Sequence, residues 1–181
     1  MLPPTSGGST GVGYNVNRHT PINSGSWSGQ RGNSIWIPTD KAVLNDIHDY
    51  SEGLGRRVDG VEYRNGHADF SPVAVYTITL SRLLYNRTDE SQFVDCTLDL
   101  RDKMEENARL VPTDRSLIQW FDDACKEVIG RGIAKIPGYT WHHDVYEGRI
   151  QLVPESIHSA CLHVGGRSIW GGGRDNRRQR T

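Results

Sequence analysis

The sequence predicts a single α+β domain in which helices and a β-hairpin precede a C-terminal strand–turn–strand–helix unit. Its 181 residues, 35% hydrophobic and 24% charged, are enough to bury one core. Helical and strand patterns are interspersed along the chain without an internal repeat, which is typical of this class. No apolar stretch approaches the length that spans a bilayer, so we expect no membrane contact.

The composition divides the chain into three parts. Residues 1–33 are rich in Gly, Ser, Pro and Asn and read as a flexible linker. Residues 34–173 form the expected folded domain, and residues 174–181 form a basic tail. The last 18 residues carry five arginines and one aspartate, a balance that favours phosphate contact, although a solvated chain end would have the same composition.

A first helix is expected from Thr39 or Asp40, either of which could be its N-cap. Apolar residues at helical spacing continue to Ile47, and Gly53 and Gly55 should end the helix.

A β-hairpin follows the first helix. The Asn65-Gly66 pair is a strong signal for a two-residue turn, and the β-branched run over residues 73–80 predicts a long strand after it.

Two further helices are expected before the C-terminal unit. A polar helix should open at Thr88 and continue to about Met104. A second helix should be capped by Asp114 and end at Gly130. It would bury the stripe formed by Leu117, Phe121, Ala124 and Val128.

Four of the seven histidines fall in the C-terminal unit, over residues 138–166. His142 and His143 end the first expected strand, a return strand covers residues 149–153, and a helix follows that carries His158 and approaches His163. Imidazole both binds divalent metals and exchanges protons near neutral pH. We therefore expect a metal or catalytic site on a ββα unit.

His142 and His143 should have different roles, because adjacent residues of a strand point to opposite sides. One can bind the metal while the other faces a water molecule. That division suits metal-assisted hydrolysis of a phosphodiester bond, which needs a base for the water and a cation for the phosphate.

The spacing of His158 and His163 leaves the ligand set open. Five residues on an ideal helix separate two side chains by about 140°. Either the helix ends before His163, or another group completes the site. Cys161 is that alternative ligand, since it shares the helix face of His158. Otherwise the three widely spaced cysteines, Cys96, Cys125 and Cys161, are expected to be reduced and buried.

These motifs resemble a known family. Tyr139-Thr-Trp-His-His143, then Gln151-Leu-Val-Pro154, His158 and His163-Val-Gly-Gly166 look like the WHH group of HNH nucleases, specifically the DNase/tRNase domain of colicin-like bacteriocins and polymorphic bacterial toxins. Val61-Glu-Tyr-Arg-Asn-Gly66 and Asp69-Phe-Ser-Pro72 resemble a second signature of that family. The resemblance extends over roughly residues 25–170.

The resemblance implies a ββα-metal (His-Me finger) fold and a role for each histidine. His142, His158 and His163 would bind one divalent metal ion, Zn²⁺ or Mg²⁺, and His143 would be the general base. Arg149 is a further catalytic candidate that would hold the phosphate. Arginines expected to contact nucleic acid are Arg64, Arg167, Arg174, Arg177 and Arg178.

The resemblance also implies partners and a setting. The substrate would be DNA, with RNA or tRNA on the same scaffold as the alternative. The domain would be the toxic part of a larger secreted effector, attached through the N-terminal linker and acting in the cytoplasm of a target bacterium. A cognate immunity protein would protect the producer. From another class, a zinc-stabilised module that binds nucleic acid without cleaving it would require a closed shell of four ligands.

Overall fold

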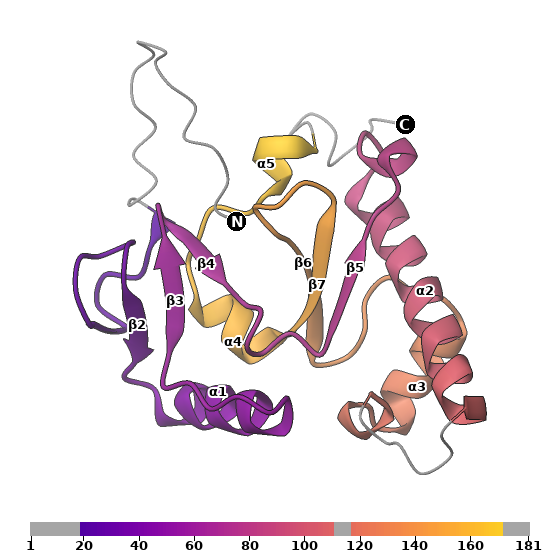
Figure 1. Ribbon diagram of the computed structural model, residues 1–181, viewed down its shortest axis with the longest axis horizontal. Helices are drawn as coiled ribbons and strands as arrows, with labels where there is room; N and C mark the ends of the chain where they lie inside the picture. The colour runs from indigo at the N-terminus through magenta and orange to yellow at the C-terminus, as the bar shows by residue number, and fades with distance from the viewer. Residues whose placement is uncertain (1–18, 111–116, 172–181) are drawn as a thin grey trace.

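The computed structural model describes residues 19–110 and 117–171 and confirms the α+β class (Figure 1). Two antiparallel sheets make up its β structure, with strand orders β1-β2-β3-β4 and β5-β7-β6. The strands are β1 (Gly25–Trp27), β2 (Ile35–Pro38), β3 (Val61–Arg64), β4 (His67–Asp69), β5 (Tyr76–Thr79), β6 (Tyr139–His143) and β7 (Arg149–Pro154). The basic tail and the expected cap Asp114 lie outside the described residues.

The folded body begins inside the segment expected to be a linker. β1 pairs with β2, and the Trp27 ring packs edge-on against Tyr63 with centroids 4.9 Å apart. Strand pairing and this aromatic contact offset the ordering cost of a Gly/Ser-rich segment, which composition alone does not reveal.

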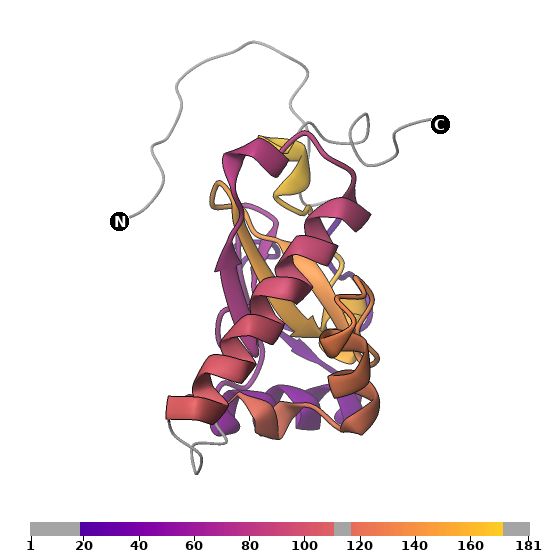
Figure 2. The same cartoon turned by 90° about the vertical axis from the view of Figure 1, so that its right-hand side faces the viewer.

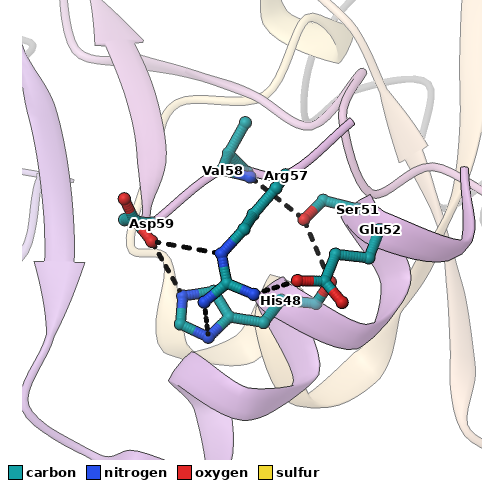
Figure 3. Close-up of polar contacts among 6 residues, drawn as sticks. All are labelled: His48, Ser51, Glu52, Arg57, Val58 and Asp59. Carbon is teal, nitrogen blue, oxygen red and sulfur yellow. Dashed lines mark hydrogen bonds and ion pairs between the residues drawn. The ribbon is translucent and has the colours of Figure 1, made fainter. Parts of the chain in front are cut away.

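The first helix is confirmed as α1 (Lys41–Gly53). The Asp40 carboxylate caps it by accepting a hydrogen bond from the Ala42 amide at 2.8 Å. Near its C-terminal end, His48 contacts Asp59 at 3.1 Å and Ser51 accepts a hydrogen bond from the Val58 amide (Figure 3). These contacts tie α1 to the loop that leads into β3.

The hairpin is also confirmed, but the strand after it is shorter than expected. Asn65 and Gly66 have φ of 52° and 78°, as a two-residue type I′ turn between β3 and β4 requires. Residues 71–73 form a turn instead of a strand, with the Val73 and Ala74 amides both bonded to the Phe70 carbonyl. β5 therefore begins only at Tyr76.

Two helices, α2 (Asp89–Leu110) and α3 (Asp123–Gly130), pack against the second sheet. The second helix was expected to be capped by Asp114. In the structure Asp122 is the cap of α3, accepting from the Cys125 amide at 2.8 Å, and a short 3₁₀ turn (Ile118–Trp120) precedes it. An aspartate thus caps this helix, but it lies eight residues, about two helical turns, closer to Gly130 than the expected cap Asp114.

The sheet β5-β7-β6 divides the core into two parts. Trp141, Ile150 and Leu152 face the helices α2 and α3, whereas Val153 belongs to a second cluster with β3, β4, α1 and α4 (Glu155–Ala160). Figure 1 shows α4 between β4 and the β6–β7 pair, and Figure 2 shows α2 crossing in front of the sheet. No helix in the described ranges is long and apolar enough to cross a membrane.

Candidate active site

The C-terminal unit is built as a β-ribbon followed by a helix. β6 and β7 pair so that His142 lies opposite Gln151 and His143 opposite Ile150. At the turn between them, Asp144 accepts a hydrogen bond from the Tyr146 amide at 2.9 Å. α4 then begins directly after β7, with Pro154 as its N-cap residue. The expected ββα unit is confirmed.

Three imidazoles converge in the space between β6, α4 and the chain that follows α4. The His142 Nδ1 atom lies 3.3 Å from His158 Nε2 and 3.2 Å from His163 Nε2. The three ligating atoms are all within 4.8 Å of one another. The Phe70 ring packs against all three, with centroids 4.8 to 5.4 Å away.

His163 reaches this cluster because the helix ends before it. α4 stops at Ala160, and residues 162–165 have no regular structure. The Cys161 carbonyl lies 2.5 Å from His163 Nδ1. A carbonyl oxygen only accepts, so Nδ1 carries a proton, and in the neutral ring Nε2 presents its lone pair to the cluster.

Cys161 does not take the alternative ligand position. Its side chain is 1% exposed and packs in the apolar cluster that contains Tyr63 and Ile157. Burial raises the pKa of the Cys161 thiol to about 12. All three cysteines are free and buried, as expected.

The cluster favours neutral imidazoles. Burial lowers the pKa of His142 well below its usual range, and His163 and His158 lower it further. Burial and the proximity of His163 also lower the pKa of His158 to about 4, and burial lowers that of His163. Uncharged rings with lone pairs available are the form in which histidine binds a metal.

These residues fit a divalent cation. Nitrogen atoms of three rings lie within 4.8 Å of one another, and among the described residues this group includes no carboxylate or thiol. The proton on His163 Nδ1 is held by a backbone carbonyl, the second partner that metal-binding histidines usually have. His142 Nδ1 faces both His158 Nε2 and His163 Nε2. Without a cation, at most one N–H hydrogen can lie in each of these two gaps.

His143 lies in a different environment on the opposite side of β6. Its side chain is 6% exposed and packs against Phe93 and Trp170, with ring centroids 5.1 and 5.5 Å away. The His143 Nε2 atom lies 2.7 Å from Gln92 Oε1. The expected separation of the two adjacent histidines is therefore confirmed.

Gln92 is a site residue that sequence reasoning missed. Its Nε2 donates to the carbonyls of Leu84 and Tyr85 at 2.7 and 3.0 Å, which fixes the orientation of the amide. Oε1 must then accept from His143 Nε2, so in the neutral ring the lone pair is on Nδ1. A glutamine in a polar helix, 51 residues from its partner, gives no local signal in the sequence.

Arg149 lies at the turn between β6 and β7. Its Nη2 pairs with the buried Asp144 carboxylate at 2.8 Å, and its guanidinium lies 4.4 Å from the centre of the Tyr146 ring. The Arg149 Nε atom is buried and has no hydrogen-bond partner among residues 19–110 and 117–171. This side chain, 31% exposed, keeps donors available beside the histidines.

The other arginines expected to contact nucleic acid differ. Arg64 is exposed on β3 and pairs with Glu62 at 2.9 Å. Arg167 is fully buried, against the expectation of a surface contact; it pairs with Asp89 at 3.0 Å and donates to the carbonyls of Tyr85 and Arg87. Because Arg167 is enclosed by these groups, it anchors α5 (Arg167–Trp170) instead of facing a ligand. Arg174, Arg177 and Arg178 lie outside the described residues.

This ββα unit thus combines three histidines that could hold a cation with a fourth that is held separately on the other side of β6. Residues 132–173 match the family model WHH, described as a nuclease of the HNH/ENDO VII superfamily with conserved WHH. Residues 132–173, which hold His142, His143, His158 and His163, thus match a WHH nuclease domain, and a nuclease domain implies a nucleic-acid substrate. No curated protein and no solved structure matches the chain.

Proposed function

We propose that the protein is a metal-dependent endonuclease that hydrolyses phosphodiester bonds of DNA. The observation that carries the proposal is the convergence of His142, His158 and His163, with His143 held separately on the next position of the strand. The first three provide a cation site and the fourth a base, the two functions that the reaction needs.

The metal proposed for the site is Zn²⁺. Three imidazole nitrogens suit Zn²⁺, whereas Mg²⁺ prefers oxygen ligands. A divalent ion held there would supply positive charge to stabilise the phosphate and the leaving oxygen during cleavage. The same three histidines give no closed four-residue shell among the described residues, which disfavours a purely structural zinc site.

The chain's own residues divide the remaining work. His143 would accept a proton from the attacking water at Nδ1, because Gln92 holds the proton on its other nitrogen. Arg149 would bind a phosphate oxygen through the guanidinium donors that Asp144 does not use. Arg64 remains an exposed candidate for a contact with the nucleic-acid backbone.

DNA is the proposed substrate, and RNA or tRNA on the same scaffold is the alternative, since the resemblance is to DNase/tRNase domains of bacteriocins. The decisive experiment incubates the purified protein with supercoiled plasmid and with tRNA, each with and without added Zn²⁺ or Mg²⁺. We expect nicked and linear plasmid with 5′-phosphate ends, intact tRNA, and no cleavage after chelation. Cleavage of tRNA alone would make the protein a ribonuclease, and cleavage of neither substrate would overturn the nuclease proposal.

The same resemblance supports a role as the toxic effector domain of an interbacterial antagonism system. The domain would be delivered as part of a larger secreted protein, act in the cytoplasm of the target cell, and be neutralised by an acidic immunity protein. Expression in a bacterial cytoplasm should stop growth and fragment the chromosome, while His143→Ala should be harmless. Undiminished growth with active enzyme would contradict the toxin role.

A further inference from the structure

The segment between α4 and α5 carries His163 in a stretch without helical hydrogen bonds. The Cys161 carbonyl holds the ring proton of His163. No helix fixes the backbone that carries the ring, because α4 has ended at Ala160. Beyond it, Gly166 donates to the His143 carbonyl at 2.7 Å, so the far end of the segment is tied to β6. The contacts that fix the peptide groups on either side of His163 come from elsewhere in the fold.

Two side chains of the β3–β4 hairpin hold the peptide groups on either side of His163. The Tyr63 hydroxyl donates to the Leu162 carbonyl at 3.1 Å. His67 Nδ1 lies 2.8 Å from the Val164 carbonyl and must donate to it, because a carbonyl only accepts. These bonds join residues 99 and 97 positions apart in the chain.

The hairpin is itself firmly placed. Tyr63 is 1% exposed, and the register puts it opposite Ala68 and puts Arg64 opposite His67. At the turn, the Asn65 amide donates to Asn33 Oδ1 at 2.8 Å and the Gly66 amide to the Gly32 carbonyl at 2.9 Å. The hairpin is therefore rigid enough to hold the segment that is hydrogen-bonded to it in one place.

We propose that the β3–β4 hairpin is part of the metal centre, with Tyr63 and His67 as positioning residues that set His163 as the third ligand. The inference rests on the proposed metal site. It explains how His158 and His163 serve one ion although their five-residue spacing would separate them on a continuous helix. It also assigns a role to a hairpin that lies outside the matched segment 132–173.

Metal binding by the full chain tests the inference independently of cleavage. Zn²⁺ affinity would be measured by competition with a chromophoric chelator, and Co²⁺ would report ligand geometry through its visible absorption. We expect His67→Leu to weaken metal binding roughly 10- to 100-fold, as for other residues that orient a ligand, and to change the Co²⁺ spectrum. Tyr63→Phe, which removes one oxygen atom, should have a smaller effect of the same kind.

His67→Asn is the rescuing variant. The asparagine amide nitrogen occupies a place similar to histidine Nδ1 and can donate to the Val164 carbonyl. It should restore most of the affinity and the original Co²⁺ spectrum. A merely structural role for His67 would not predict recovery by a smaller side chain.

The chain offers matched controls away from the segment. His48→Leu removes a histidine of α1 that contacts Arg57 and Asp59 in the loop before β3 (Figure 3). Tyr76→Phe removes a hydroxyl that donates to Asp99 at 2.6 Å. Both should bind metal as the parent does, and thermal unfolding without metal would show that each variant is folded.

The outcomes separate the two proposals. A parent protein that binds no Zn²⁺ or Co²⁺ would overturn the metal site and this inference with it. A parent that binds, with His67→Leu and Tyr63→Phe equal to it in affinity and spectrum, would overturn the inference alone. If His67→Leu does not fold, Tyr63→Phe against Tyr76→Phe decides.

Discussion

His142 and His143 are adjacent in the chain and equally buried, yet their surroundings have opposite characters. His142 faces two other imidazoles and the Phe70 ring, and its Nδ1 is the point on which His158 and His163 converge. His143 faces Gln92, whose amide is bonded in turn to the chain before α2. On the His142 side, three ring nitrogens that could bind a metal lie together. On the His143 side, the polar groups are already joined by hydrogen bonds.

The difference arises because successive side chains of β6 point to opposite faces, and a packed layer lies on each face. β6 presents His142 to α4 and His143 to α2, so each histidine takes its chemistry from a different helix. Arg167 belongs to the His143 side, since it and Gln92 both donate to the Tyr85 carbonyl. A single strand thus separates the proposed metal ligand from the proposed base.

The largest expected effect comes from removing the proposed base. His143→Ala should lower the rate of plasmid cleavage roughly 10²- to 10⁴-fold, the range for losing a general base, because the water loses its proton acceptor. Zn²⁺ affinity should change little, since His143 is not among the converging ligands. Quantitative cleavage at saturating metal measures the effect, and a rate equal to that of the parent would remove His143 from the mechanism.

The next effect concerns stability on the His143 side. Arg167→Met removes the buried ion-pair partner of Asp89, a donor to the Arg87 carbonyl and one of the two side-chain donors to the Tyr85 carbonyl. It should destabilise the fold by about 3–5 kcal/mol. Arg64→Met, at an exposed pair, should cost less than about 1 kcal/mol. Urea unfolding compares them; equal stabilities would mean that Arg167 is not the anchor described.

The His142 side should give the metal-free protein a pH-dependent stability. The folded-state pKa of His158 is lowered to about 4, and those of His142 and His163 are lowered too, whereas unfolded histidine titrates near 6.5. Below about pH 6.5 the unfolded chain therefore binds more protons, and stability should fall as pH decreases toward 4.

The sign and size of this effect can be measured by urea unfolding between pH 8 and 4.5. Each histidine contributes a slope of at most about 1.4 kcal/mol per pH unit. Stability should be flat with respect to these groups above pH 7, and His158→Ala should reduce the slope below pH 6.5. A slope unchanged by His158→Ala would contradict burial of a neutral imidazole at this position.

The smallest effect is expected for the residue that orients His143. Gln92→Met removes one hydrogen bond to the base and should slow cleavage about tenfold, corresponding to about 1.4 kcal/mol. Metal affinity should be unchanged, because Gln92 does not contact the three converging histidines. If metal affinity fell more than the cleavage rate, Gln92 would act on the metal site and not on His143.

Local signals in the sequence were sufficient for much of the fold. The Asp40 cap, the Asn65-Gly66 turn and the strand–turn–strand–helix pattern at residues 138–160 each depend on neighbours in the chain, and each is present. The start of α3 was misplaced because two aspartates could cap it, and only the Cys125 amide distinguishes Asp122.

The sequence indicated the histidines of the candidate site but not the residues that hold them in position. The four histidines and their alternation predicted a metal site and different roles for His142 and His143, and the resemblance to a nuclease family suggested which was which. The position of His163 depended on where α4 ends, which the sequence left open. Gln92, Tyr63 and His67 act across long sequence separations, and Arg167 is buried by contacts with residues about 80 positions earlier. Such contacts leave no periodicity or spacing in one sequence.

The most direct test of the account is a calorimetric Zn²⁺ titration of the parent protein, His142→Ala and His143→Ala under identical conditions. We predict one tight site in the parent, the same site in His143→Ala, and affinity reduced by at least about 100-fold in His142→Ala, since a ligand rather than its support is lost. Equal affinity in His142→Ala, or loss of binding in His143→Ala, would contradict the division of roles across β6.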